Sequence, residues 1–224
     1  MGKVILFQKL EKVQKSEPSK AMAAIGKSPT LSDIQRLGKR LETGTTEREL
    51  RDRAILVLLA VIGMRASELL LLRKSDFKLH DGTHVVQYRR PKRRDVHTVK
   101  LSMETRSRIV SAIETYHEVA GLTSDHIFWS LPNHLRNNAR TQLTTRSLQR
   151  IVNSWNIRAG NGKLIAPHAI RHLVGWTVSK QKDFIHAQKL LGHADPKTTS
   201  TYYTDPSVFA FLTEPTNPYP DQVP

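Results

Sequence analysis

The chain has 224 residues, enough for one domain with a substantial hydrophobic core, and carries 35 Lys and Arg against 20 Asp and Glu, a formal net charge of +15 at pH 7. This charge predicts a positive surface that attracts a polyanion. A nucleic acid is favoured over a membrane, because no amphipathic stretch sets aromatic residues opposite lysines. The absence of cysteine excludes disulfides, thiolate metal sites and cysteine nucleophiles.

The N-terminal part of the chain gives no sign of export or membrane insertion. The longest apolar run of the whole chain, residues 54–62, has nine residues, whereas a bilayer span needs roughly 20. The first residues lack the apolar core and the cleavage site of a signal peptide. We therefore expect an intracellular protein, cytoplasmic and associated with the nucleoid. Residues 1–27 are rich in lysine and are interpreted as a basic N-terminal arm.

Helical spacing of apolar residues begins after this arm. Thr30 or Ser32 can cap a helix that runs through Leu41. Residues 47–62 form a second predicted helix whose apolar residues face all directions, which is typical of a helix at the centre of a core. Gly63 interrupts the pattern, and residues 65–72 resume as a short helix.

The period changes between residues 83 and 101, where polar and apolar residues alternate on both sides of the segment PKRRD. This alternation predicts a β-hairpin with a basic tip. Helical patterns return at residues 104–120, 147–157, 169–179 and 185–191. Four prolines in the last twelve residues predict a disordered tail at 213–224. We expect a mainly α domain at residues 28–212 with a small antiparallel β-hairpin, an α+β fold.

Residues 126–182 contain nine Lys or Arg and no Asp or Glu. A solvated basic face is one interpretation, but such faces usually intersperse acidic residues for i,i+4 pairing. A surface laid along a phosphate backbone would exclude acidic residues, and we favour this second interpretation. The candidate DNA-contacting side chains are arginines of this stretch and of the hairpin: Arg89, Arg90, Arg93, Arg94, Arg140, Arg146 and Arg150.

Arg65 lies between two apolar runs in the segment GMRASEL, residues 63–69. An unpaired guanidinium in such surroundings is costly. Glu68 follows three residues later and shares the helical face of Arg65. Two interpretations stay open from these residues alone: a buried ion pair that closes a helix junction, or a carboxylate that orients Arg65 toward a bound anion.

The segment PHAIRH, residues 167–172, places His168 and Arg171 on one face near a predicted helix N-terminus, where backbone N–H groups favour an anion. The i,i+4 spacing of His168 and His172 would also fit a metal pair. That alternative is disfavoured because no acidic ligand lies nearby and Arg171 would repel a cation. We expect phosphate contacts from His168 and Arg171, core packing from His172, and no metal.

The segment LLGH, residues 190–193, leads through a polar run to Tyr202 and Tyr203. A tyrosine after a polar loop usually packs or donates a hydrogen bond. Its phenol has a pKa of about 10, so its use as a nucleophile requires a positive, preorganised site.

Four motifs in this order resemble the signature of the tyrosine recombinases, over roughly residues 28–205. They are RASEL, a basic hairpin with a lysine, HxxRH, and LLGH followed nine residues later by Tyr. The resemblance implies the catalytic-domain fold of that family. Counting back from VKL selects Lys92 over Lys100, and the nine-residue step selects Tyr202 over Tyr203. The implied site comprises two phosphate-clamping arginines, a supporting acid, the hairpin lysine, two histidines and the nucleophile: Arg65, Arg171, Glu68, Lys92, His168, His193 and Tyr202.

The resemblance also implies a mechanism. Tyr202 attacks a DNA phosphodiester and leaves a 3'-phosphotyrosine and a free 5'-hydroxyl. Lys92 protonates the departing 5'-oxygen, His168 helps to move the tyrosine proton, and His193 hydrogen-bonds the phosphate. The phosphotyrosine ester stores the bond energy needed for rejoining, so no metal, ATP or other cofactor is expected.

The implied partners are double-stranded DNA, further copies of the chain in a dimer or tetramer on DNA, and accessory DNA-bending proteins, with no membrane. Residues 207–212 are a candidate assembly segment. Most relatives carry a DNA-clamping domain before the catalytic one, whereas residues 1–27 alone precede it here. Three explanations stay open: a catalytic-domain fragment, a single-domain recombinase resembling DNA invertases, or a catalytically silent DNA-binding or regulatory relative. A type IB topoisomerase-like enzyme is a further alternative because it uses the same chemistry.

Overall fold

The structure, a computed structural model, describes residues 28–192, apart from the side chains of Arg136 and Phe184. Its helices and strands follow in the order α3 (Leu31–Glu42), α4 (Glu47–Ile62), α5 (Ala66–Leu71), β1 (Phe77–His80), β2 (Thr83–Arg90), β3 (Asp95–Lys100), α6 (Met103–Ala120), α7 (Thr145–Ser154), α8 (Pro167–Gln181) and α9 (Phe184–Leu191). The fold class is confirmed: helices dominate, and the sheet is small and antiparallel. The expected arm and tail, His193, Tyr202 and residues 207–212 lie outside the described residues.

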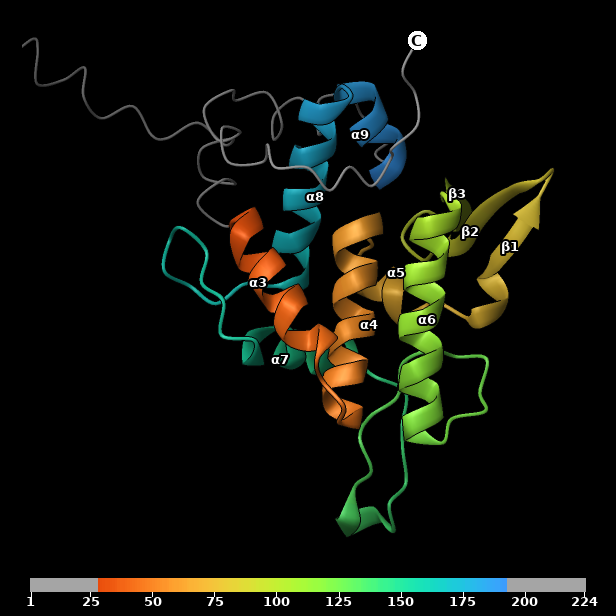
Figure 1. Cartoon of the computed structure of the whole chain (residues 1–224), viewed down its shortest axis with the longest axis vertical. Helices are drawn as coiled ribbons and strands as arrows, with labels where there is room; N and C mark the ends of the chain where they lie inside the picture. The colour runs from red at the N-terminus through yellow and green to blue at the C-terminus, as the bar shows by residue number, and fades with distance from the viewer. Residues whose placement is uncertain (1–27, 193–224) are drawn as a thin grey trace, which may run out of the picture.

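Helix α4 forms the centre of the domain, as its all-round apolar sequence predicts. It packs against α3, α6 and α8, which surround it in Figure 1. Ile55, Leu58 and Leu59 on this helix are fully buried. Thr46 and Glu49 close its N-terminus in a capping box, and Gly63 ends it in the left-handed conformation with φ of 69°.

The sheet has the order β1-β2-β3, with both pairs antiparallel. The predicted hairpin is β2 and β3, in a register that pairs Tyr88 with His97 and Arg90 with Asp95. Strand β1 was not predicted, because it is a short, mostly exposed edge strand that lacks the alternation of a half-buried strand. Helix α5 packs against β2 and thereby brings the segment after Gly63 next to the hairpin.

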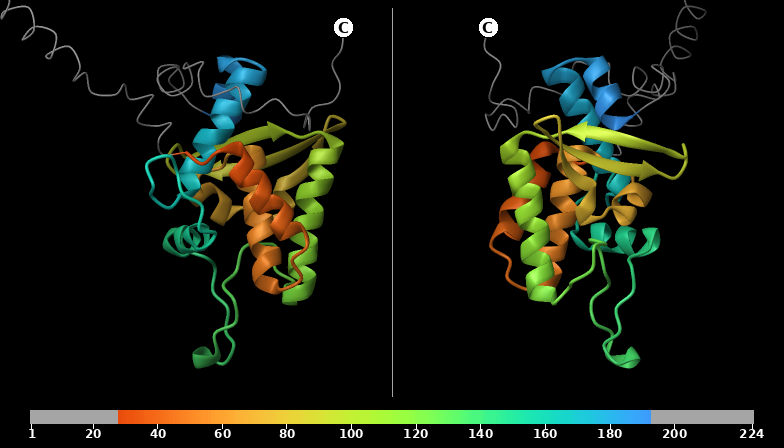
Figure 2. Two further views of the ribbon diagram at one scale, coloured as in Figure 1. Left: turned by 60° about the vertical axis from the view of Figure 1, so that its left-hand side comes forward. Right: turned by 90° about the vertical axis from the view of Figure 1, so that its right-hand side faces the viewer.

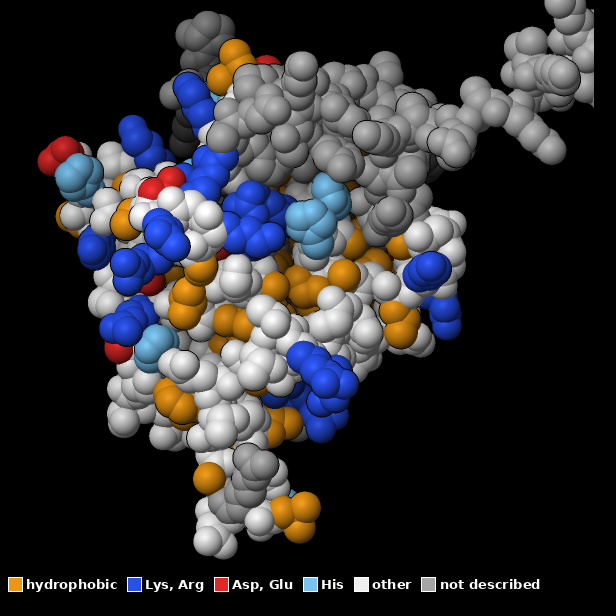
Figure 3. Space-filling view, turned by 180° about the vertical axis from the view of Figure 1, so that it is seen from behind, with side chains coloured by type: hydrophobic (Ala, Val, Ile, Leu, Met, Phe, Trp, Pro, Cys, Tyr) orange, Lys and Arg blue, Asp and Glu red, His pale blue; other side chains and the backbone are white. Residues whose placement is uncertain are grey.

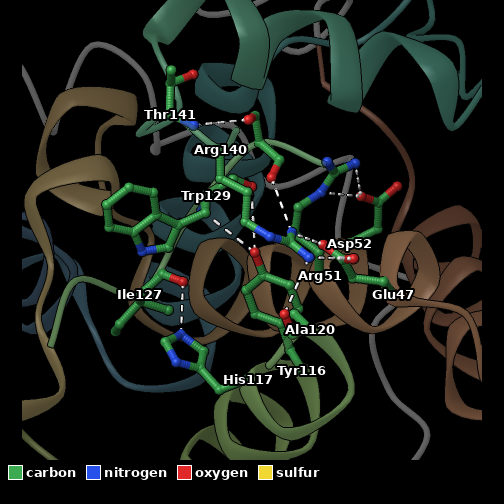
Figure 4. A network of polar contacts seen from close by, with 11 residues as sticks. Glu47, Arg51, Asp52, Tyr116, His117, Ala120, Ile127, Trp129, Arg140 and Thr141 are labelled. Carbon is green, nitrogen blue, oxygen red and sulfur yellow. Dashed lines mark hydrogen bonds and ion pairs between the residues drawn. The ribbon is translucent and has the colours of Figure 1, made fainter. Parts of the chain in front are cut away.

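Between α6 and α7 the chain leaves the body of the domain as an extended arm (Figures 1 and 2). The bridges Trp129↔Gln142 and Asn133↔Ala139 pair its two sides. Arg140 fixes the arm to the body: its Nη1 and Nη2 pair with both carboxylate oxygens of Glu47, and Nη2 also donates to the carbonyl of Ala120 at 3.1 Å (Figure 4).

Helices α8 and α9 complete the described chain. Pro167 occupies the first turn of α8, as its fixed φ favours. The side chain of Asp183 caps α9 by accepting a hydrogen bond from the His186 N–H, and Gly192 ends this helix in the left-handed conformation. Within residues 28–192, no helix combines the length and the apolar character that a membrane crossing requires.

Candidate active site

The turn between α4 and α5 positions Arg65. Gly63 has a positive φ, and a Cβ at this position would lie 2.7 Å from Leu191 Cδ2, so no larger residue fits without a shift. Arg65 is the N-cap residue of α5, and its backbone N–H donates to Glu68 Oε2 at 2.8 Å. The side chain of Arg65 is 27% exposed and so remains partly open to solvent.

Glu68 is the buried centre of the cluster, with 2% of its side chain exposed. Its Oε1 accepts from Arg65 Nη1 at 2.8 Å, and its Oε2 lies 3.8 Å from Arg171 Nη1. One carboxylate therefore holds both arginines. The two interpretations left open for Arg65 are compatible here, because the ion pair also fixes the direction of a part-exposed guanidinium.

Arg171 is buried and held on two further sides. Its Nη1 donates to the carbonyl of Gly63 at 2.6 Å, and its Nη2 donates to the carbonyl of Leu191 at 2.5 Å. These bonds join the end of α4, the middle of α8 and the end of α9 at one guanidinium. The HxxRH segment and the RASEL segment thus meet as expected, although 108 residues separate Arg171 from Gly63.

His168 lies at the edge of the same cluster. Its ring is exposed and meets His172 edge to face at a centroid distance of 4.4 Å. The surrounding protein lowers the pKa of His168 below its ordinary value, first through desolvation and then through the positive charges of Arg171, Arg65 and Lys92. His168 is therefore neutral near pH 7. The contribution from Lys92 places the hairpin lysine within electrostatic reach of His168.

The space-filling view in Figure 3 shows Lys and Arg side chains gathered next to histidines on this face, with acidic side chains toward its left-hand and upper edges. Lys92, Arg93 and Arg94 are exposed in the turn that joins β2 to β3, and Arg89 is exposed on β2. Arg146 and Arg150 are exposed on α7. These side chains are open to a phosphate backbone, so they stay candidates for DNA contact.

Arg90 and Arg140 differ from that expectation. Arg90 is buried and donates to Asp95 through Nε at 2.7 Å and to the carbonyl of Gly192 through Nη1 at 2.9 Å. Arg140 is bound by Glu47 and by backbone carbonyls, including that of Ser130 at 3.2 Å. Both guanidiniums therefore have internal roles in place of the expected surface contact.

Two features of the site were not predicted from the sequence. His97 on β3 contacts the carbonyl of Leu190 through Nε2 at 2.9 Å. Tyr88 is buried beside Glu68: burial and the Glu68 carboxylate, in that order, raise the pKa of its phenol. A signal for Arg90 was present, since it continues the alternation of Val86 and Tyr88, both buried. Among the described residues, no group of three or more His, Asp or Glu is arranged to hold a metal ion.

Comparison with known proteins finds matches over most of the chain. The model of the phage integrase family matches residues 29–208. The tyrosine recombinase XerD of Staphylococcus haemolyticus is 27% identical over 180 residues, which cover 79% of this chain and 58% of the relative. The tyrosine recombinase XerD of Yersinia pestis is 32% identical over 218 residues, which cover 88% of this chain and 66% of the relative. The chain thus spans only 58% and 66% of the length of these two relatives.

Solved structures show the same fold. The XerA recombinase superposes with a TM-score of 0.60 at 25% identity, over 81% of this chain and 61% of that one. The XerH site-specific recombinase bound to difH substrate superposes with a TM-score of 0.60 at 18% identity, over 82% and 52% of the two chains. The family match covers most of the chain, and the described part of the expected signature meets in one cluster. The chain belongs to the phage integrase family, the tyrosine recombinases.

Proposed function

We propose that the chain is a site-specific DNA recombinase of the integrase or invertase type, which cuts and rejoins DNA through a 3'-phosphotyrosine intermediate. The observation that carries this proposal is the convergence of Arg65 and Arg171 on the buried carboxylate of Glu68. Relatives named as recombinases, and a XerH structure described as a pre-cleavage complex with its DNA substrate, support it.

The two guanidiniums bind the non-bridging oxygens of the scissile phosphate. A phosphodiester under attack passes through a five-coordinate species with additional negative charge on these oxygens. Donors that are already fixed stabilise this charge without reorganising, and each can lower the barrier by roughly 3 to 4 kcal/mol. Arg171 is fixed by its hydrogen bonds to the carbonyls of Gly63 and Leu191 and by its ion pair with Glu68. Arg65 is fixed by its hydrogen bond to Glu68.

Residues around Arg65 and Arg171 carry out the proton transfers. Tyr202 attacks phosphorus, the bond from phosphorus to the 5'-oxygen breaks, and Lys92 donates a proton to that oxygen. His168, neutral near pH 7, accepts the tyrosine proton directly or through water. His193 hydrogen-bonds the phosphate. The reaction reverses when a 5'-hydroxyl attacks the phosphotyrosine, so the chemistry needs neither ATP nor a metal ion.

The proposal includes partners and location. Double-stranded DNA lies against the exposed arginines of the hairpin turn and α7, and copies of the chain assemble on it, as the lambda integrase dimer bound to a core site does. Residues 28–212 form the catalytic domain, flanked by a basic arm and a proline-rich tail. The protein acts in the cytoplasm, at the nucleoid.

A covalent-capture experiment tests the proposal. Wild-type protein is mixed in EDTA with labelled duplex DNA that carries a nick beside the scissile phosphate, so that the released fragment diffuses away. We expect a labelled protein–DNA band on a denaturing gel. Supercoiled plasmid relaxation by monomeric protein would instead indicate a topoisomerase. DNA binding without any covalent band, on substrates selected from genomic DNA, would refute the enzymatic proposal.

A further inference from the structure

The C-terminal end of α9 is held by three side chains from elsewhere in the fold. The carbonyl of Leu190 contacts His97 Nε2 at 2.9 Å, that of Leu191 accepts from Arg171 Nη2 at 2.5 Å, and that of Gly192 accepts from Arg90 Nη1 at 2.9 Å. Because a carbonyl can only accept, Nε2 of His97 carries the proton. Three consecutive carbonyls thus receive donors from β3, α8 and β2.

This arrangement is unusual for a short helix. The last carbonyls of a helix have no partner within it and are normally bound by water or by the following residues. Helix α9 has eight residues, too few to be stable alone in water, so its end depends on tertiary contacts. Two of the three donors are guanidiniums, which the negative end of the helix dipole favours.

The hairpin side of this contact is itself rigid. Arg90 is paired with Asp95 across the last register position of β2 and β3, through Nε at 2.7 Å and through a second bond from Nη2. The backbone N–H groups of Arg93 and Arg94 both donate to the carbonyl of Arg90. The turn that carries Lys92 therefore begins at the residue that binds the end of α9.

The side chains around Gly192 are tightly packed. A Cβ on Gly192 would collide with Nη1 of Arg90. His97 is half-buried and meets Tyr88 edge to face at 5.4 Å, and Tyr88 is itself buried. The sheet thus fixes the last described residue, Gly192, and the next residue along the chain is His193.

We propose that Arg90 and His97 are positioning residues, which hold the C-terminus of α9 against the sheet and so set the point from which the segment carrying His193 and Tyr202 departs. This inference rests on the proposed function. Through Arg90, the hairpin turn with the general acid and the segment with the nucleophile share one anchor. Arg171 takes part in the same anchor, so binding of the scissile phosphate and placement of the nucleophile are mechanically linked.

The test uses the full chain and single-turnover covalent capture on the nicked duplex, together with DNA affinity. Arg90→Ala and His97→Ala should slow capture by roughly 10- to 100-fold, as a displacement of about 1 Å does. DNA affinity should stay within about threefold, because both side chains are engaged by backbone carbonyls within the fold. His97→Gln should recover most of the rate, since its amide can donate to the Leu190 carbonyl. Lys100→Ala is the control of equal charge on β3: its side chain is exposed, and it should behave as wild type.

A substrate with sulfur in place of the bridging 5'-oxygen separates positioning from acid catalysis. A thiolate departs without protonation, so this substrate should restore capture by Lys92→Ala and leave Arg90→Ala and His97→Ala slow. Restored capture in the Arg90 and His97 variants would overturn the inference, as would wild-type rates with the ordinary substrate. If Arg90→Ala unfolds, seen as a lost thermal transition, the comparison of His97→Ala with His97→Gln tests the inference: slow capture by the first and recovery by the second support it. Absence of any wild-type adduct would instead refute the proposed function, and this reaction is run first.

Discussion

Replacing Glu68 by glutamine perturbs the cluster at its centre with little change in volume. In the native chain the carboxylate accepts from the backbone N–H and Nη1 of Arg65, each at 2.8 Å, and faces Arg171 Nη1 at 3.8 Å. Glutamine keeps one acceptor oxygen, turns an NH₂ group toward a donor, and removes the negative charge that lies 3.8 Å from the buried guanidinium of Arg171.

The cost follows from these contacts. A hydrogen bond to a charged group contributes about 1.5 to 3 kcal/mol, and removing one partner of a buried pair costs about 3 to 5 kcal/mol. Because 27% of the Arg65 side chain is exposed, solvent screens its part. We therefore expect a loss of about 3 kcal/mol in the free energy of unfolding.

Urea denaturation at pH 7 measures this loss, and covalent capture measures its effect on the phosphate clamp. We expect capture to fall by at least about 100-fold, since the misdirection of one fixed donor costs that much. Glu104→Gln is the matched control: this carboxylate is 61% exposed and lies 3.7 Å from Arg108, so the change should stay within about 0.5 kcal/mol. A Glu68→Gln protein as stable and as active as wild type would refute the account of the cluster.

Three further predictions concern the surroundings of the cluster. Arg140→Ala should destabilise the fold by about 3 kcal/mol in urea denaturation and leave DNA affinity unchanged. Arg146→Ala should keep the stability of wild type and reduce the slope of log affinity against log salt by about 1. Weaker DNA binding by Arg140→Ala, or a loss of stability in Arg146→Ala, would contradict these roles. The NMR titration midpoint of His168 should lie below about 6.5, the ordinary value, because desolvation and three nearby positive charges disfavour its protonation. This unfavourable protonation costs stability only as the pH falls through that ordinary value, and a midpoint at or above about 6.5 would contradict the prediction. Gly63→Ala should lower the free energy of unfolding by about 1 to 3 kcal/mol, because the position has a positive φ and the added Cβ would collide with Leu191. Thermal unfolding measures this loss, and an unchanged melting temperature would argue against both the strain and the collision.

Much of the scaffold follows from local sequence, because capping and periodicity act over a few residues. The bounds of α4 were predicted from its all-round apolar pattern and the glycine after it, and Thr30 caps α3 as expected. Edge strand β1 was missed because an exposed strand has little hydrophobic periodicity. The burial of Arg51 and Asp52 on α4 was missed as well, since it depends on Trp155, which donates to Asp52 at 3.0 Å from 103 residues away.

The site shows the same division. The sequence pairs Arg65 with Glu68 through i,i+3 spacing, and the resemblance brings in Arg171. Local spacing does not reveal that Arg171 also binds the carbonyls that end α4 and α9, because that contact exists only once three helices have packed. The role of Arg90 was misjudged for a related reason: a run of arginines at a hairpin tip indicates a surface, while strand alternation places this one inward.

The identity of the nucleophile is the central claim and can be measured directly. Wild type, Tyr202→Phe and Tyr203→Phe are each incubated with the nicked duplex in EDTA, and the adduct is digested and sequenced by mass spectrometry. The account predicts a DNA fragment joined to Tyr202 in wild type and in Tyr203→Phe, with no adduct in Tyr202→Phe although DNA binding persists. An adduct that survives Tyr202→Phe, or one mapped to another residue, would contradict it.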